Sequence, residues 1–106
     1  MSWFYLVLAG ILEVVWAVLL KLSEGFSKLG FSIATIVVMI ASFLCLSQAT
    51  KTLPLGTSYA IWTGIGALGA LIVGIVFFKE SVNAARVFFA LLLLIGIIGL
   101  KFTTEQ

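Results

Sequence analysis

Glu13 stands in the middle of a long apolar run, where a carboxylate is out of place. The run extends from Trp3 to Leu20, close to the ~20 residues that a helix needs to span a bilayer. A charged side chain at the bilayer centre costs about 3 kcal/mol on insertion scales, and no basic residue lies three or four positions away to neutralise it within a helix. Glu13 must therefore be protonated or hold a cation that comes to it.

The residues one helical turn from Glu13 are mostly small. Ala9, Gly10 and Ala17 share its helical face, together with Trp16. Small side chains leave room for a neighbouring helix, a ligand or water, while Trp16 contributes an aromatic face and one N–H donor. We expect Gly10 and Trp16 to line a pocket around the carboxylate.

Three further residues have the chemistry and the depth to complete such a pocket. Ser42 lies near the middle of the second apolar run, and Tyr59 and Trp62 stand three positions apart in the third. Taken alone, a membrane serine usually bonds the backbone of its own helix, and a tyrosine near a helix end usually anchors the interface. Beside a membrane glutamate we favour the alternative, in which Ser42 orients the carboxylate and the two rings line the site.

A pocket with a carboxylate and aromatic faces suits an organic cation. The carboxylate neutralises the charge, aromatic faces add cation–π attraction, and hydroxyl groups orient the carboxylate. A site that holds either protons or a cation, but never both, is the physical basis of antiport. The arrangement therefore predicts a transport protein rather than an enzyme, working without a cofactor.

The composition predicts the elements that position these residues. Of 106 residues, 63% are hydrophobic and 9% are charged, which is more apolar surface than a soluble domain of this size can bury. Each of four apolar runs is long enough for one membrane-spanning helix, and they cover about residues 3–20, 29–49, 57–78 and 83–102. We expect an all-α integral membrane protein, with residues 1–106 forming a single four-helix transmembrane domain whose short links make successive helices antiparallel.

The composition also excludes several classes of function. There is no histidine and one cysteine, so neither a disulfide within the chain nor a Cys/His metal site is expected. The net charge of +2, without a basic cluster, argues against binding nucleic acid. The N-terminus lacks a basic segment and a cleavage site, so we interpret the first run as a retained helix and not as a signal peptide.

The basic residues show only a weak preference for one end of the expected helices. The four on one side are Lys21, Lys28, Lys79 and Arg86, and the two on the other are Lys51 and Lys101. Ordinary sampling in a small protein explains this weak positive-inside bias as well as insertion in both orientations does. Insertion in both orientations allows an antiparallel homodimer, which supplies the inverted half that many transporters use and brings two copies of Glu13 together.

Small residues recur along the third run. Gly66, Ala70 and Gly74 continue its aromatic stripe at helical spacing, and we interpret them as a helix-packing surface. Gly64 and Gly66 stand close enough together to loosen the helix. We expect a kink at this pair.

Three segments together resemble the small multidrug resistance family. They are residues 13–26 (EVVWAVLLKLSEGF), 41–43 (ASF) and 54–66 (PLGTSYAIWTGIG). The resemblance covers essentially the whole chain in length and helix count. It implies an antiparallel, dual-topology homodimer in the bacterial cytoplasmic (inner) membrane, which exports cations in exchange for protons by alternating access.

The resemblance also implies roles for particular residues. The glutamate that matches Glu13 binds both protons and substrate, and the residues that match Tyr59 and Trp62 line the site. The fourth helix of the family forms much of the dimer contact, so we expect Gly96 and Gly99 to form a packing notch there.

Trp16 and Lys101 distinguish between two branches of the family. One branch exports bulky quaternary ammonium compounds and tends to have a small residue at the position of Trp16; the other exports guanidinium. Both Trp16 and Lys101, which we keep as an accessory residue, look like the guanidinium branch. Guanidinium is planar, and its N–H donors form a fork that meets carboxylate oxygens two at a time.

We therefore expect a guanidinium/proton antiporter, with small substituted guanidinyl cations as candidate further substrates. If both copies of Glu13 must deprotonate to take one cation, two protons exchange for each guanidinium. The alternative is a promiscuous exporter of quaternary ammonium and other lipophilic cations. A helper subunit or channel that does not act as a carrier is the remaining class.

Overall fold

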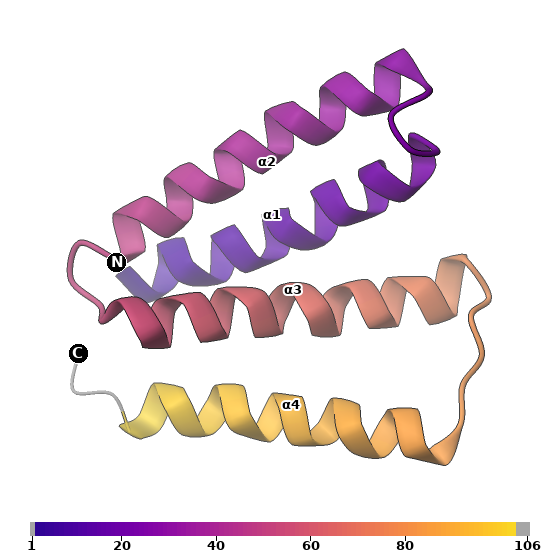
Figure 1. Ribbon diagram of the computed structural model, residues 1–106. Coiled ribbons are helices and arrows are strands. Elements are labelled where there is room, and N and C mark those ends of the chain that lie inside the picture. The colour runs from indigo at the N-terminus through magenta and orange to yellow at the C-terminus, as the bar shows by residue number, and fades with distance from the viewer. Residues whose placement is uncertain (1, 104–106) are drawn as a thin grey trace.

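The computed structural model describes residues 2–103, and this range folds into four helices (Figure 1). They are α1 (Ser2–Leu22), α2 (Leu29–Ala49), α3 (Leu55–Phe77) and α4 (Ala84–Thr103). Each is long and apolar enough to cross a membrane. The expectation of an all-α protein with four long apolar helices is confirmed.

The helix ends differ slightly from the expected ones, for local reasons. α3 begins at Leu55 and not at residue 57, because Pro54 has a fixed φ of −58° and its carbonyl already accepts the N–H of Ser58 at 2.9 Å. α4 begins after Asn83, whose side-chain Oδ1 accepts the N–H of Arg86 at 2.9 Å. These caps satisfy backbone groups that the first turn of a helix leaves without partners.

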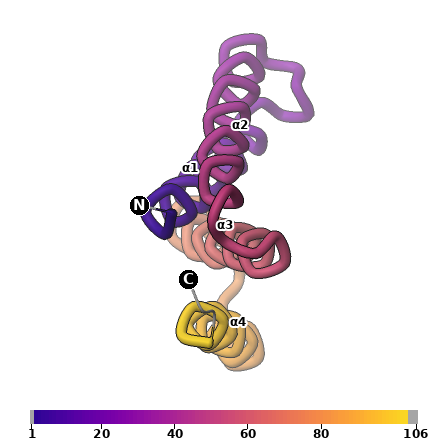
Figure 2. The backbone as a smooth tube through the Cα atoms, turned by 90° about the vertical axis from the view of Figure 1, so that its left-hand side faces the viewer, coloured from indigo at the N-terminus to yellow at the C-terminus, as the bar shows by residue number. Residues whose placement is uncertain are grey.

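The four helices lie side by side in the order α2, α1, α3, α4 (Figures 1 and 2). α1 is packed between α2 and α3, while α4 has α3 as its backbone neighbour. The chain measures 43 × 35 × 17 Å, so its shortest dimension is less than that of two stacked layers of helices, each ~10–12 Å in diameter. Within residues 2–103, the helices form a slab and not a closed bundle.

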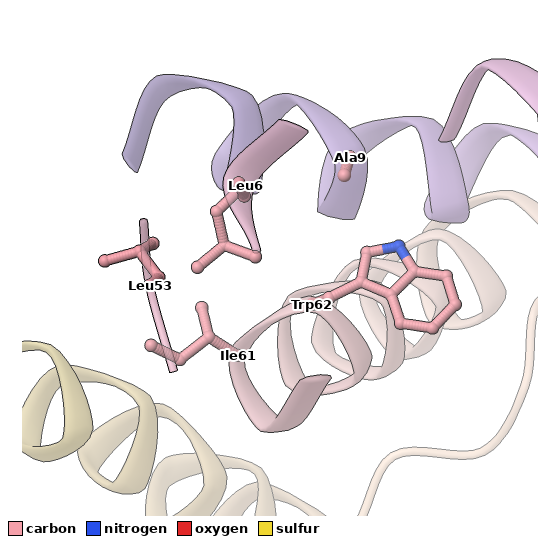
Figure 3. Packing of buried hydrophobic residues seen from close by; sticks show 6 residues of the cluster. Leu6, Ala9, Leu53, Ile61 and Trp62 are labelled. Atoms are coloured by element: carbon pink, nitrogen blue, oxygen red, sulfur yellow. The ribbon is translucent and has the colours of Figure 1, made fainter. Parts of the chain in front are cut away.

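The most buried apolar residues lie where α1 and α3 begin and α2 ends (Figure 3). Leu6 and Ala9 of α1 face Ile61 and Trp62 of α3. The rest of this cluster is contributed by Ala49 and Leu53. This end of the slab therefore holds the most buried apolar contacts between α1 and α3.

α4 is the least covered helix. None of its described residues is buried, although Ile97 reaches α3, where a Cβ on Gly64 would come within 2.8 Å of it. In a membrane, such a surface faces lipid or another helix.

Candidate functional site

Glu13 lies midway along α1, and its side chain rests on α3 at Gly66. A Cβ added to Gly66 would overlap the Glu13 carboxyl group. Gly66 is itself buried, so the α3 backbone closes this side of the carboxylate. The absence of a side chain at Gly66 is what gives the Glu13 carboxyl its place between the helices.

Two polar atoms of the site are buried without hydrogen-bond partners. One is Oε1 of Glu13, and the other is the indole Nε1 of Trp16, one turn further along α1; neither has a partner among residues 2–103. A buried acceptor and a buried donor each lose free energy when they are left unsatisfied. The two atoms mark a place where a ligand, a proton or another chain would be stabilised.

Ser42 joins three helices. Its hydroxyl donates to the carbonyl of Ala9 on α1 at 2.7 Å and accepts the indole N–H of Trp62 on α3 at 3.1 Å. It therefore bonds neighbouring helices and not the backbone of its own helix, which is the usual alternative for a membrane serine. Its one proton is donated to Ala9 in this structure, so orientation of Glu13 by Ser42 stays a prediction.

The aromatic residues form a cluster beside Ser42. The ring centroid of Trp62 lies 5.6 Å from that of Tyr59 and 5.5 Å from that of Phe43, which meets it edge-on. Trp62 is 7% exposed, whereas Tyr59 is 57% exposed, so one ring is packed inside and the other is open to the surroundings. Sequence reasoning missed Phe43 as a site residue, although its place next to Ser42 on α2 was the available signal.

Two glycines of the predicted site act as close contacts between helices. A Cβ on Gly10 would come within 2.7 Å of Ile65 on α3, so this position lets α1 approach α3. Gly64 gives the same kind of room to Ile97 of α4. α3 runs as one helix through Gly64 and Gly66, and pocket lining by Gly10 and a kink at the glycine pair stay predictions.

The remaining predicted residues are Lys101, Gly96 and Gly99, all on α4. The Nζ atom of Lys101 lies 5.0 Å from the ring centroid of Trp3 and 5.4 Å from that of Phe102. Trp3 is ten residues before Glu13 on α1, which is about 15 Å along a helix. Gly96 and Gly99 are exposed on α4, and a Cβ at either would meet open space.

Residues 1–95 match the family described as Small Multidrug Resistance protein. The chain belongs to the small multidrug resistance family. A protein named Guanidinium exporter from Escherichia coli (strain K12) is 56% identical over 99% of this chain and 100% of its own length. The Guanidinium exporter of Salmonella typhimurium (strain LT2) is 57% identical over the same shares, and that of Yersinia pestis is 56% identical over 95% of this chain and 97% of its own length.

These similarities confirm the resemblance seen in the sequence, both to the small multidrug resistance family and to its guanidinium-exporter branch. This small multidrug resistance protein is a multi-pass membrane protein with four spans. Its membrane glutamate lies on the α1–α3 contact, and its aromatic cluster is joined to α1 through Ser42.

Proposed function

We propose that this protein exports guanidinium in exchange for protons. The observation that carries the proposal is the position of the Glu13 carboxyl group, which lies midway along a membrane helix and against Gly66. Its buried Oε1 accepts no hydrogen bond from residues 2–103. A carboxylate in such a place needs a proton or a cation. Relatives named guanidinium exporters support guanidinium as that cation.

The chemistry of guanidinium fits the residues around Glu13. Its planar N–H fork pairs with the two oxygens of a carboxylate. Its flat faces stack on aromatic rings, and Trp16 on α1 and the Tyr59–Trp62 pair on α3 offer such rings. A quaternary ammonium ion has no N–H group and would leave the carboxylate oxygens without hydrogen bonds.

Protons and guanidinium compete for the same carboxylate. Either one removes the charge that makes an empty Glu13 unfavourable in the membrane. With two copies of Glu13 in one site, release of two protons makes room for one cation. The resulting exchange moves two protons inward for each guanidinium outward, so each cycle carries one net positive charge inward.

The assembly that we propose is an antiparallel homodimer in the bacterial inner membrane, with alternating access to the site. The 17 Å thickness of the chain supports this, because one layer of helices cannot surround a path and close it at both ends. A second copy in the opposite orientation supplies the inverted half of a transporter. The exposed α4 surface, with Gly96 and Gly99, is where we place the contact.

Replacement of Glu13 by Gln tests the role of the carboxylate. Glu13→Gln should leave a folded protein that does not exchange guanidinium for protons in liposomes, because the amide neither binds a proton nor neutralises a cation. We expect the guanidinium flux to fall by at least about 100-fold, which is the effect expected from losing one or two charge-assisted hydrogen bonds to the cation. Glu24→Gln is the matched control, since Glu24 is exposed and pairs with Lys28 at 2.7 Å; proton-coupled flux that persists in Glu13→Gln contradicts the proposal.

Electrical recording from wild-type liposomes tests the substrate and the coupling together. Guanidinium applied outside should move one net positive charge out per cycle, since one cation enters and two protons leave. An exchange of one for one gives no current, and a channel gives a current of opposite sign. The apparent affinity for guanidinium should fall as the pH falls, because protons then occupy Glu13. Tighter binding of tetraphenylphosphonium than of guanidinium would instead favour a multidrug exporter.

A further inference from the structure

The residue that follows Glu13 makes a second close contact with α3. A Cβ added to Gly69 would overlap Cγ2 of Val14 and would come within 3.2 Å of its Cβ and Cγ1. Gly69 lies three residues after Gly66, so the two glycines share one face of α3. Glu13 and Val14 therefore meet the same face of α3, and each of them lies against backbone and not against a side chain.

These two contacts limit the rotation of α1 about its own axis. Successive residues of an α-helix are about 100° apart around the axis. Because Glu13 and Val14 both touch α3, the line along which the two helices approach most closely runs between them. A turn of α1 that moves Glu13 away from Gly66 therefore drives Val14 further into the α3 backbone at Gly69.

A third contact, in which the glycine is on α1, limits sliding of α1 along α3. A Cβ on Gly10 would come within 2.7 Å of Ile65. Gly10 precedes Glu13 by three residues and Val14 by four, so all three lie on one face of α1. The two helices run in the same direction (Figure 1). Movement of α1 toward its own N-terminus would therefore press Glu13 and Val14 onto Ile65.

The apolar residues in these contacts are stiffer than the carboxylate between them. Val14 and Ile65 are branched at Cβ, and side chains of this kind keep one strongly preferred χ1 rotamer in a helix. Neither can turn aside, and the glycine backbone opposite has no side chain to move. Glu13 has an unbranched, flexible side chain, so its position depends on how these stiff neighbours hold α1.

We propose that Val14 and Gly69 are positioning residues for Glu13, and this inference rests on the proposed function. Their contact sets the rotation of α1 at the level from which the Glu13 side chain extends. The carboxylate then presents its two oxygens to guanidinium in one orientation. Groups that bind a ligand need to be held within about 0.5 Å of the productive geometry, so a shift caused by one added methyl group at Gly69 weakens binding.

Replacements of Gly69 and Val14, singly and together, test this contact. Gly69→Ala should weaken guanidinium binding roughly tenfold, because the new Cβ displaces Val14 and with it the α1 backbone at Glu13. Adding Val14→Ala removes the methyl groups that the new Cβ meets, so the double variant should bind within about threefold of wild type. Gly56→Ala is the matched control on α3, since a Cβ there meets open space.

Titration with guanidinium, followed by tryptophan fluorescence, separates a positioning defect from a loss of folded protein. A partly unfolded variant has fewer binding sites, but the sites that remain keep the dissociation constant of the wild type. A positioning defect raises the dissociation constant and leaves the number of sites unchanged. Recovery of the dissociation constant in the double variant is the result that a general loss of stability would not produce.

Val14→Ala alone tests the contact if Gly69→Ala does not fold. It leaves a gap beside Glu13, so the dissociation constant should rise roughly threefold. Val15→Ala removes the same groups from a neighbour that is 41% exposed, and it should bind as wild type. Equal dissociation constants for these two variants would overturn the positioning role.

Two results with Gly69→Ala would also overturn it. One is a dissociation constant equal to that of the wild type, and the other is a double variant that binds as weakly as Gly69→Ala. A wild-type protein that binds no guanidinium would instead overturn the proposed function, and the positioning role of Val14 and Gly69 with it.

Discussion

Gly66 shapes the site through the side chain that it lacks. The Glu13 carboxyl group occupies the space that a Cβ would fill at this position. Because the neighbouring surface is backbone, it cannot turn aside as a flexible side chain does. The position of Glu13 relative to its surroundings is therefore set by an α3 residue that itself has no titratable group.

Replacement of Gly66 by Ala should displace the Glu13 side chain. Overpacking of this kind lowers the free energy of unfolding by about 1–3 kcal/mol. We expect guanidinium affinity to fall by roughly tenfold or more, because the Glu13 carboxyl group is displaced from its position against Gly66. Tryptophan fluorescence titration with guanidinium measures this. Gly56→Ala, on the same helix, is the control, because a Cβ there meets open space; equal affinities in the two variants would show that the Gly66 contact does not position Glu13.

Among the secondary-structure elements, α2 is connected to the site through Ser42. One hydroxyl bonds the Ala9 carbonyl on α1 and the Trp62 indole on α3. Both partners belong to the most buried part of the chain. Any movement of α2 relative to α1 and α3 must break one of these two bonds or carry its partner along.

Replacement of Ser42 by Ala should loosen this junction. The change leaves the buried N–H of Trp62 without an acceptor, at an expected loss of about 1–3 kcal/mol in the free energy of unfolding. Thermal unfolding in detergent, followed by near-ultraviolet circular dichroism of the tryptophans, measures the effect. Ser47→Ala removes an exposed hydroxyl from the same helix, and a melting temperature as high as that of this control would contradict the structural role of Ser42.

The sequence predicts the helices better than it predicts their contacts. Hydropathy and run length indicate all four helices, and the cost of a membrane carboxylate singles out Glu13. The hydrogen-bond partners of Ser42 and the contact of Glu13 with Gly66 depend on the rotation and separation of helix pairs, which hydrophobic periodicity does not determine. For the same reason, the pattern gives no sign that Glu80, beyond the end of α3, folds back to Gly74.

Among the four helices, α4 leaves the most surface for a partner to cover. α4 has no buried residue, and the open positions Gly96 and Gly99 stand three residues apart on it. Small residues on one face of a helix let two helices approach closely in lipid. The proposed homodimer gives this surface an occupant, namely the same surface of a second copy.

Replacing Gly96 and Gly99 by larger residues tests the proposed homodimer. Gly96→Leu combined with Gly99→Leu should weaken the dimer and reduce transport, while each chain stays helical, because leucine favours the helix more than glycine does. Chemical cross-linking in liposomes, diluted with lipid, measures the dimer fraction. Gly30→Leu is the control, since that position on α2 is equally open; an undiminished dimer fraction in the double variant would move the contact to another surface.

The two ends of the helix slab, which would lie at opposite membrane surfaces, differ in their residues. One end has a cavity between Lys21 and Glu80, and the other has the stacking of Lys101 on Trp3. In the proposed antiparallel pair, a rotation axis in the membrane plane places one end of each kind at both surfaces, so any single substitution alters the inside and the outside together. In such a homodimer, a point mutation therefore cannot make transport faster in one direction across the membrane than in the other. A built-in preference for one direction requires two non-identical chains.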